Sequence, residues 1–417
     1  KEEAAMKICG LVAEYNPFHN GHVHHMQEAR KATGCDYLIV VMSGDYVQRG
    51  TPAVIDKYER CAMALNSGAD LVLEIPTLFS TASAEIFATA AVNLLTQLGC
   101  VDSICFGTEL GELEPLNLIA GVLNHEPTEV SVRIRENLRE GMHYAKARSD
   151  ALVRYFDGRI PDLEHVLETS NNILGIEYLR AIDRLHSSLT PYTIKRWTTE
   201  FHSKRTYEDT ASATALRSML YEEGLEQIVP YVPAYVAREF SMKYGLTTPI
   251  RANDFSQILQ YLLERDRDRL TEYLDFSPEL AERVNNLLPD VYQFKEWSSA
   301  MKSKNVTHTR INRALLHVIL GIRETDLEAY KDEDYCMYAR VLGFRKESTA
   351  LLTEISKSTP LPMITKMASA KSILSPKALR LLQFDITGAN TYRNVVYQKY
   401  GTLLKDEFTN GLVMDYD

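Results

Sequence analysis

The sequence has no long apolar run, no CxxC pair and no surplus of positive charge. No stretch approaches the roughly 18 to 20 apolar residues that span a bilayer. Residues 1–5 (KEEAA) lack the apolar core of a signal peptide. The sequence therefore predicts no membrane partner. The six cysteines lie mostly in apolar stretches, which favours reduced, buried thiols in a cytoplasmic protein over disulfides or a zinc finger.

The charge balance limits how the chain can meet nucleic acid. It carries 46 Lys and Arg against 56 Asp and Glu, a formal net charge of −10. Non-specific affinity for nucleic acid comes from neutralised phosphates, so a protein that coats RNA or DNA is excluded. Any RNA contact needs a local basic face. With 417 residues, 45% hydrophobic and 24% charged, the chain is typical of a globular protein of two or three domains.

The first half of the chain alternates predicted strands and helices. Apolar runs predict strands at residues 8–13, 37–42, 71–75, 103–106 and 192–197, and helical spacing predicts helices between them, at residues 22–32, 56–66 and 84–98 among others. This order predicts an α/β fold with a parallel, Rossmann-like sheet over residues 6–224. Beyond residue 224 helical patterns broken by prolines predict an all-α domain, residues 225–417.

The first strand leads into the most informative stretch. The Asn16-Pro17 pair predicts a turn, and a helix follows from about His22, so free N–H groups and a positive helix end face an anion site. His19 and His22 stand in that turn, and Gly21 leaves room for a flat base or ribose. The loops at residues 43–49 and 107–109 end the neighbouring strands, where open parallel sheets bind ligands.

Other residues allow competing interpretations. His22, His24 and His25 together suggest zinc, but on a helix they point in different directions, and we predict no metal site. Gln48 and Arg49 offer hydrogen bonds to a carboxylate or phosphate, and Lys57 could face the same substrate loop; each could equally be a solvated surface residue.

Two strings carry a family resemblance. EYNPFHNGH at residues 14–22 and MSGDYVQRGTPA at residues 42–53 resemble the bacterial tRNA(Met) cytidine acetate ligase family, within the HxGH nucleotidyltransferase superfamily. The resemblance implies an enzyme that uses ATP, with Mg²⁺, to convert acetate into acetyl-adenylate. It then acetylates the wobble cytidine of elongator tRNA(Met).

The resemblance also implies roles for individual residues. His19 and His22 are the expected catalytic donors. The expected ATP-binding residues are Val12, Ala13, Glu14, Tyr15, Asn16, Pro17, Phe18, His19, Asn20, Gly21, His22, Val23, His24, His25, Gly107, Asn171 and Arg196. Residues 212–217 resemble the ISSTxxR motif, which implies phosphate contacts for Ser212, Thr214 and Arg217. Ala213 replaces one serine of that motif, and no KMSK string is present to favour a synthetase.

Basic residues in the C-terminal half mark a possible tRNA footprint in an acidic region: Lys302, Lys304, Arg310, Arg345 and Lys346. Further basic clusters lie at residues 195–196 and 202–205. Two other functions remain open from the sequence. One is a small-molecule adenylyltransferase of cofactor biosynthesis, and the other is a non-catalytic RNA-binding protein that keeps a nucleotide pocket. The acetate pocket and the oligomeric state are not readable from the sequence.

Overall fold

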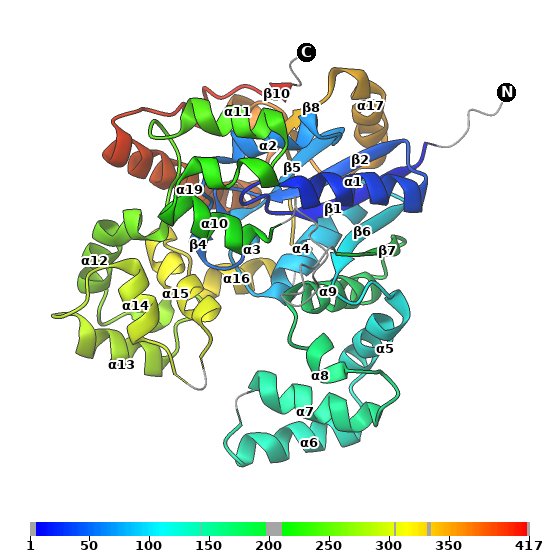
Figure 1. Ribbon diagram of the computed structural model, residues 1–417, viewed down its shortest axis with the longest axis vertical. Helices are drawn as coiled ribbons and strands as arrows, with labels where there is room; N and C mark the ends of the chain where they lie inside the picture. The colour runs from blue at the N-terminus through cyan, green and yellow to red at the C-terminus, as the bar shows by residue number, and fades with distance from the viewer. Residues whose placement is uncertain (1–5, 143, 197–210, 304–305, 332–334, 415–417) are drawn as a thin grey trace.

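An eight-stranded sheet runs through the centre of the molecule (Figure 1). The computed structural model describes residues 6–142, 144–196, 211–303, 306–331 and 335–414. The strands stand in the order β10, β8, β5, β2, β1, β6 and β7, with β9 beside β8, while β3 and β4 form a separate hairpin. Their bounds are Ile8–Ala13 (β1), Tyr37–Ser43 (β2), Tyr46–Val47 (β3), Thr51–Pro52 (β4), Leu71–Ile75 (β5), Ser103–Thr108 (β6), Thr190–Lys195 (β7), Ala339–Phe344 (β8), Met363–Ile364 (β9) and Val413–Met414 (β10).

The five strands predicted from apolar runs are present as β1, β2, β5, β6 and β7. They are parallel to one another, and β1, β2 and β5 are almost entirely buried. Strands buried on both faces need helices on both sides, because neither face can be left to water. The prediction of a parallel α/β sheet is confirmed.

Helices cover both faces of this sheet. On one face α1 (Asn20–Thr33) and α2 (Lys57–Asn66) share an apolar cluster with α10 (Ala213–Glu222) and α11 (Ala234–Lys243). On the other face α4 (Ala84–Gln97) packs against α9 (Ser170–Arg184). The remaining helices are α3 (Thr77–Ser80), α5 (Leu113–Asn124), α6 (Thr128–Arg139), α7 (Tyr144–Phe156), α8 (Leu163–Val166), α12 (Ser256–Arg265), α13 (Pro278–Leu287), α14 (Phe294–Ala300), α15 (His308–Leu320), α16 (Glu324–Lys331), α17 (Thr349–Ser358), α18 (Ala370–Ile373) and α19 (Pro376–Tyr400).

The expectation of an all-α segment over residues 225–417 requires correction. This segment is mostly helical, but it also supplies β8, β9 and β10 to the central sheet. β8 pairs antiparallel with β5, and β10 pairs with β8. A short apolar run between helical segments gives no local sign that its partner is a strand far earlier in the chain. The C-terminal half therefore completes the sheet that the first half begins.

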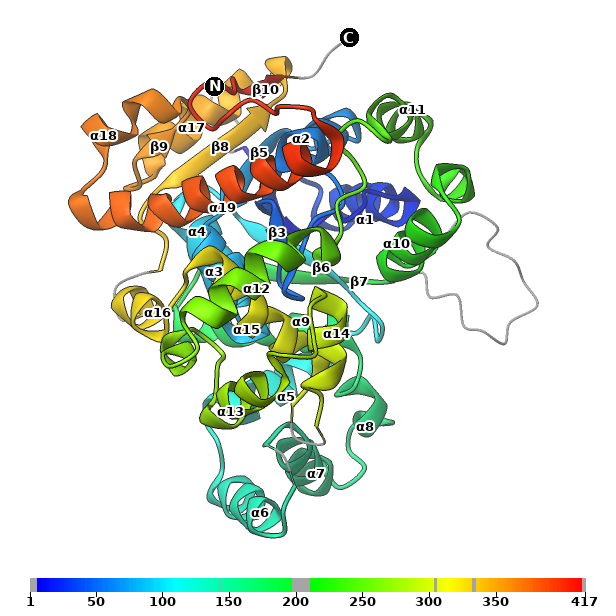
Figure 2. The same cartoon turned by 90° about the vertical axis from the view of Figure 1, so that its left-hand side faces the viewer.

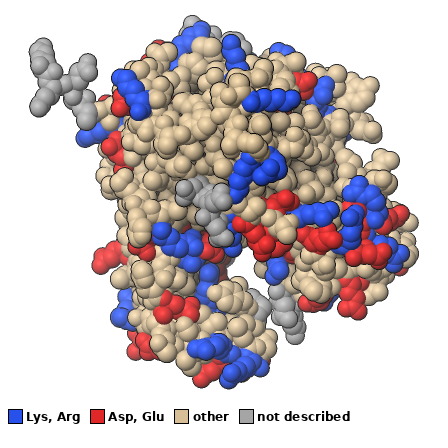
Figure 3. All heavy atoms as spheres, turned by 180° about the vertical axis from the view of Figure 1, so that it is seen from behind, with Lys and Arg blue, Asp and Glu red and all other residues tan. Residues whose placement is uncertain are grey.

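Two helical lobes project from the body around the sheet (Figures 1 and 2). One lobe contains α5–α8, and the other contains α12–α15. Figure 3 shows a hollow between them, and basic and acidic side chains mixed over the lobe of α12–α15. None of the helices within the described ranges is both long and apolar enough to cross a membrane.

Candidate active site at the end of the first strand

Two stacked imidazoles form the turn between β1 and α1. His19 is the N-cap of α1, which begins at Asn20. The Nδ1 atom of His19 accepts a hydrogen bond from the backbone N–H of Gly21 at 3.1 Å. The Nδ1 atom of His22 accepts one from the backbone N–H of His19 at 3.2 Å. The two rings lie 3.7 Å apart, centroid to centroid, at 22°. The backbone of the turn therefore fixes both rings.

These hydrogen bonds determine where each ring carries its proton. A neutral imidazole that accepts at Nδ1 carries its proton on Nε2 and donates there. Burial, with Arg196 and Arg217 nearby, lowers the pKa of His19 to about 3. Burial, His19 and Arg196 hold the pKa of His22 well below its ordinary value. Both rings are therefore neutral at pH 7, and each presents an Nε2–H donor.

The donor of His19 lacks a partner, and two neighbouring side chains also have an unpaired nitrogen atom. The buried Nε2 atoms of His19 and of His25, one turn further along α1, have no hydrogen-bond partner among the described residues, and neither has the Nδ2 atom of Asn16. Leaving a buried donor unsatisfied costs about 1–3 kcal/mol. The Nε2–H group of His19 and the amide of Asn16 are two such donors in the same turn, and they point to a ligand that brings acceptor atoms.

Several predicted ATP-binding residues also support the turn. Tyr15 and Phe18 are buried, with ring centroids 4.8 and 5.3 Å from that of His22. The Oδ1 atom of Asn16 accepts a hydrogen bond from the backbone N–H of Val54 at 2.9 Å. Beside Gly21, a Cβ atom would lie 2.9 Å from Cε1 of His19. The turn therefore requires glycine at this position because a side chain would meet the His19 ring, and the approach of a base or ribose to the glycine backbone stays a prediction.

The other residues of this stretch take varied positions. Pro17 is buried, and Val12, Ala13 and Glu14 are half-buried at the end of β1. The Nδ2 atom of Asn20 donates to the carbonyl of Pro230 at 3.3 Å. Val23 packs against the apolar cluster under α1. His24 lies near Glu28 and Lys31, away from the stacked pair, because adjacent helical residues face different directions.

The loop after β2 closes over the first turn, as the sequence suggests. The backbone N–H of Gln48 donates to Oε1 of Glu14 at 2.8 Å. The Nη2 atom of Arg49 lies 3.4 Å from Oγ of Ser170, the first residue of α9. Gln48 and Arg49 therefore lie between the first turn and the start of α9.

Lys57 does not face this loop, and its assignment to the substrate is wrong. It is buried, and its Nζ atom binds Glu74 at 2.8 Å and Glu407 at 2.9 Å. Arg60, one turn along α2, donates to the carbonyls of Glu14 and Ser43 at 2.6 and 3.1 Å. Through Arg60, the buried face of α2 thus anchors both site loops from behind, while Lys57 is already paired with two carboxylates.

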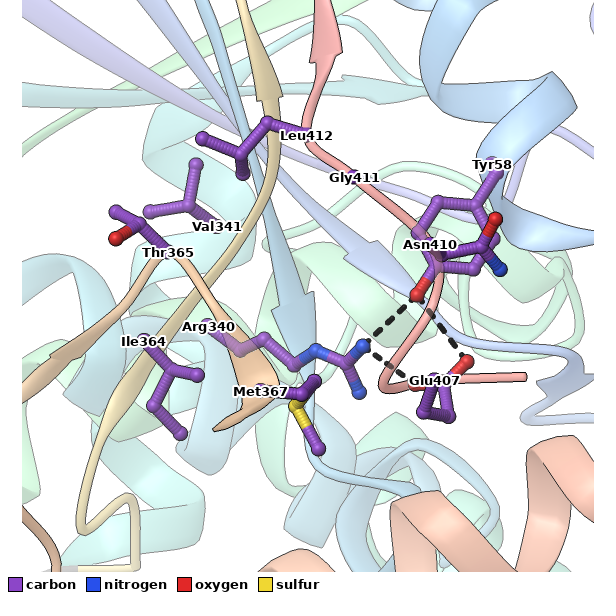
Figure 4. Close-up of a pocket in the computed structure, with 10 residues that line it drawn as sticks. All are labelled: Tyr58, Arg340, Val341, Ile364, Thr365, Met367, Glu407, Asn410, Gly411 and Leu412. Atoms are coloured by element: carbon purple, nitrogen blue, oxygen red, sulfur yellow. Dashed lines mark hydrogen bonds and ion pairs between the residues drawn. The ribbon is translucent and has the colours of Figure 1, made fainter. Parts of the chain in front are cut away.

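Figure 4 shows the centre of this buried ionic network. Arg340 of β8 pairs with Glu407 and lies 3.1 Å from Oε2 of Glu74. The hydroxyl of Tyr58 joins them, accepting from Arg340 at 2.9 Å and donating to Glu407 at 3.2 Å. Two cations and two carboxylates balance, which is the condition for burying charges at all. The C-terminal tail thus reaches the back of the active-site loop.

Gly107, Asn171 and Arg196 gather at one place, as the resemblance implies. Arg196 packs across Gly107, where a Cβ atom would lie 3.1 Å from Cγ of the arginine. Asn171 is the second residue of α9 and not its cap. Its Nδ2 atom donates to Oε1 of Glu109 at 2.6 Å. Glu109 is not among the predicted site residues, although it stands two positions after Gly107 in the predicted site loop, residues 107–109.

The helix that follows residue 211 also docks on the first turn. Ser212 is its N-cap and accepts from the backbone N–H of Ala215 at 3.2 Å. Arg217 donates to the carbonyl of Asn16 at 2.7 Å and to Oγ1 of Thr214 at 3.0 Å. Burial lowers the pKa of Arg217 while Glu14 opposes the shift, so the guanidinium stays charged. Arg217 therefore adds a fixed cation beside His19.

The predicted tRNA-binding residues fall into two groups. Lys302 is exposed, and Arg310 lies in α15, whose neighbouring residue Arg313 packs against Gly50 of the site loop. Arg345 and Lys346 follow β8, whose last residue pairs with the first residue of β5. They therefore stand at the edge of the sheet opposite the histidines, and the structure does not bring them to the site. Lys304 and residues 202–205 lie outside the described residues.

Within the described ranges, no group of three or more His, Cys, Asp or Glu side chains is arranged to hold a metal ion. His22 and His25 lie one turn apart on α1, but His24 lies near Glu28, so the three imidazoles do not share one face of the helix.

The neutral histidines predict a loss of stability in acid. The pKa of His19 is about 3 in the folded protein, against 6.5 for the ordinary group, so the unfolded chain binds a proton that the folded protein excludes. The protein has its full free energy of unfolding above about pH 6.5. That free energy falls as the pH drops towards 4, by about 2 kcal/mol at pH 5 from His19 alone. Burial and Arg196 lower the pKa of His25 to about 4, which adds a loss of the same sign.

Urea unfolding at pH 7.5 and pH 5 measures this loss. The variant His19→Asn, His25→Asn serves as the control, because its stability should differ less between the two pH values. An equal difference in both proteins would assign the acid sensitivity to other groups.

The chain is similar to known proteins over most of its length. Residues 6–406 match the family model described as HIGH Nucleotidyl Transferase. The tRNA(Met) cytidine acetate ligase of Thermoanaerobacter sp. (strain X514) is 41% identical over 391 residues, covering 93% of this chain and 95% of the relative. That of Caldanaerobacter subterraneus subsp. tengcongensis is 39% identical over 405 residues, covering 97% and 98%.

Solved structures with a similar fold are also found. The crystal structure of Thermotoga maritima TmcAL bound with alpha-thio ATP is 30% identical, with a TM-score of 0.89, and covers 98% of this chain and 100% of that chain. Its apo form gives a TM-score of 0.90 over the same coverage. With a full-length family match and relatives of this identity, the chain belongs to the tRNA(Met) cytidine acetate ligase family of HIGH nucleotidyl transferases.

Proposed function

We propose that this protein is an ATP-dependent ligase that acts in the cytoplasm on elongator tRNA(Met), converting its wobble cytidine to acetylcytidine. The observation that carries the proposal is the pair of stacked, neutral histidines. Each presents an Nε2–H donor, and the donor of His19 has no acceptor among the described residues. Arg49, Arg196 and Arg217 surround this turn with positive charge. Acceptor atoms in a positively charged pocket are what the phosphates of ATP supply.

In the first step, an acetate oxygen attacks the α-phosphorus of ATP, and the bond to pyrophosphate breaks. Charge accumulates on the phosphate oxygens, where fixed donors and cations lower the barrier without a protein nucleophile. We assign His19 and His22 as those donors, with Arg217 and Arg196 as cations. Mg²⁺ enters with ATP, coordinated mainly by its phosphates.

In the second step, the exocyclic amine of the cytidine attacks the acetyl carbonyl of the adenylate. The bond to the phosphate oxygen breaks, AMP leaves, and the amine loses a proton. The base must reach the adenylate, which single-stranded loop nucleotides do most readily. We place the stem-loop in the hollow between the two helical lobes (Figure 3), one of which contains α15, the helix that packs against Gly50 of the site loop.

Mass spectrometry of nucleosides tests the reaction. Unmodified elongator tRNA(Met) is incubated with the protein, Mg²⁺, ATP and labelled acetate. Labelled acetylcytidine that requires both ATP and acetate is the expected result. AMP joined to a mononucleotide or phosphopantetheine in a parallel screen would instead indicate a cofactor adenylyltransferase. Neither product, with tRNA still bound, would indicate a non-catalytic RNA-binding protein.

The tRNA footprint is expected on the side of α15. Replacing Lys302 and Arg310 with alanine should weaken tRNA binding and reduce the slope of log K against log salt by roughly 1 to 2, because two phosphate contacts are lost. The matched control replaces Arg345 and Lys346, which stand at the opposite edge of the sheet. Filter binding at several salt concentrations measures both. Weaker binding only in the control would move the footprint to that edge.

A further inference from the structure

Glu109 connects β6 with the first turn of α9. Its Oε1 atom accepts from Nδ2 of Asn171 at 2.6 Å and from the backbone N–H of Asn171 at 3.3 Å. Its Oε2 atom accepts from the backbone N–H of Asn172 at 2.8 Å. The carboxylate also acts on Arg196, whose pKa burial lowers and Glu109 raises. One side chain thus contacts or faces two residues that the resemblance assigns to ATP.

This contact sets the direction of the Asn171 amide. A carboxylate only accepts hydrogen bonds, so the NH₂ group of Asn171 must face Glu109, and its Oδ1 atom must point away. Across the described ranges, that Oδ1 atom has no hydrogen-bond partner. The next residue back, Ser170, contacts Arg49 of the site loop. Beside the site loop, Asn171 therefore offers an acceptor and not a donor.

A hydrogen-bond acceptor at this position can pair only with those groups of ATP that donate a hydrogen bond. Phosphate oxygens only accept, so they do not pair with Oδ1. The groups of ATP that donate are the exocyclic amine of the base and the ribose hydroxyls. We infer that Glu109 is a positioning residue that holds Asn171 so that its Oδ1 atom accepts a hydrogen bond from the nucleoside part of ATP. The inference rests on the proposed function only in taking ATP as the ligand of this site.

Three variants separate this role from simple capping of α9. Asn171→Ala removes the acceptor. In Glu109→Gln, the new amide oxygen accepts from the backbone N–H of Asn172, and the new NH₂ group faces Asn171. Asn171 then turns its Oδ1 atom towards that NH₂ group, and its own NH₂ group, a donor, faces the ligand. The double variant Glu109→Gln, Asn171→Asp reverses the hydrogen bond, because the aspartate accepts from the glutamine and presents its other oxygen. An acceptor is then restored to the pocket.

Calorimetry measures the dissociation constants of ATP, 2′-deoxy-ATP, 3′-deoxy-ATP and purine riboside triphosphate, which lacks the exocyclic amine. The original protein is expected to bind one analogue about 10-fold more weakly than ATP, the effect of one hydrogen bond. That analogue identifies the donor. The ratio of the dissociation constant of that analogue to that of ATP should fall to about 1 in Glu109→Gln and Asn171→Ala. It should return to about 10 in the double variant.

Two results would overturn the inference. The first is equal binding of ATP and all three analogues by the original protein. The second is a ratio that stays unchanged in either single variant or is not restored in the double variant, which would leave Glu109 as a helix cap only. Binding needs neither acetate nor tRNA. Acetate-dependent exchange of pyrophosphate into ATP by the original protein therefore tests the proposed function separately. If the protein binds ATP selectively but shows no exchange, the proposed function is wrong and the inference about Glu109 stands.

Discussion

Replacing His22 with asparagine is expected to lower acetyl-adenylate formation about 10²- to 10³-fold while the protein stays folded. The side-chain oxygen of asparagine takes the position of Nδ1 and accepts from the backbone N–H of His19, as the imidazole does at 3.2 Å. It has no group that reaches the position of Nε2. The substitution therefore keeps the hydrogen bond that shapes the turn and removes the donor, and loss of one such donor costs this much in other enzymes.

His19→Asn is a parallel test, since asparagine is a favoured N-cap and can accept from Gly21 in place of Nδ1. Acetate-dependent exchange of pyrophosphate into ATP measures the first step, and filter binding measures tRNA affinity, which should stay near that of the original protein. His125→Ala is the matched control, because that histidine is 80% exposed and lies outside the site. Equal losses of exchange, tRNA binding and thermal stability would make the histidines structural.

Glu407→Ala is expected to destabilise the protein by about 3–5 kcal/mol. Glu407 is buried with Lys57 and Arg340, and its removal leaves two buried cations with only Glu74 between them. An uncompensated buried charge costs this much. Burial alone would raise the pKa of Glu407, but Lys57 and Arg340 lower it to about 2. The contribution of ionised Glu407 to the free energy of unfolding should therefore be fully present above about pH 4.5 and be lost as the pH falls towards 2.

Urea unfolding at pH 7 measures this loss, with Lys405→Ala, an exposed neighbour in the same tail, as the control that should change stability by less than about 0.5 kcal/mol. Adding Lys57→Met to Glu407→Ala restores the balance of one cation and one carboxylate. The double variant should thus lose less than the sum of the two single variants. A loss below about 1 kcal/mol for Glu407→Ala would show that water reaches and screens the network.

The first half of the fold was readable from the sequence because its signals are local. Each buried strand is a short apolar run, and helices such as α2 and α10 begin at a polar cap, Asp56 and Ser212. The stretch from Glu14 to His22 was readable for the same reason, since the turn, the two histidines and the helix start are consecutive. The loop of Gln48 and Arg49 followed from its place after the second strand.

The sequence alone determined a parallel α/β sheet, a histidine-bearing turn at the end of its first strand, and the polar loops that end the neighbouring strands. Only the tertiary structure decided which of their side chains face that turn. Lys57 turns inward because Glu74 and Glu407 neutralise it, and Arg345 lies at the far edge because β8 runs antiparallel to β5. The pairing of Glu109 with Asn171 likewise joins residues 62 positions apart. Charge pairing and strand direction depend on contacts between distant segments, and no local pattern of residues records them.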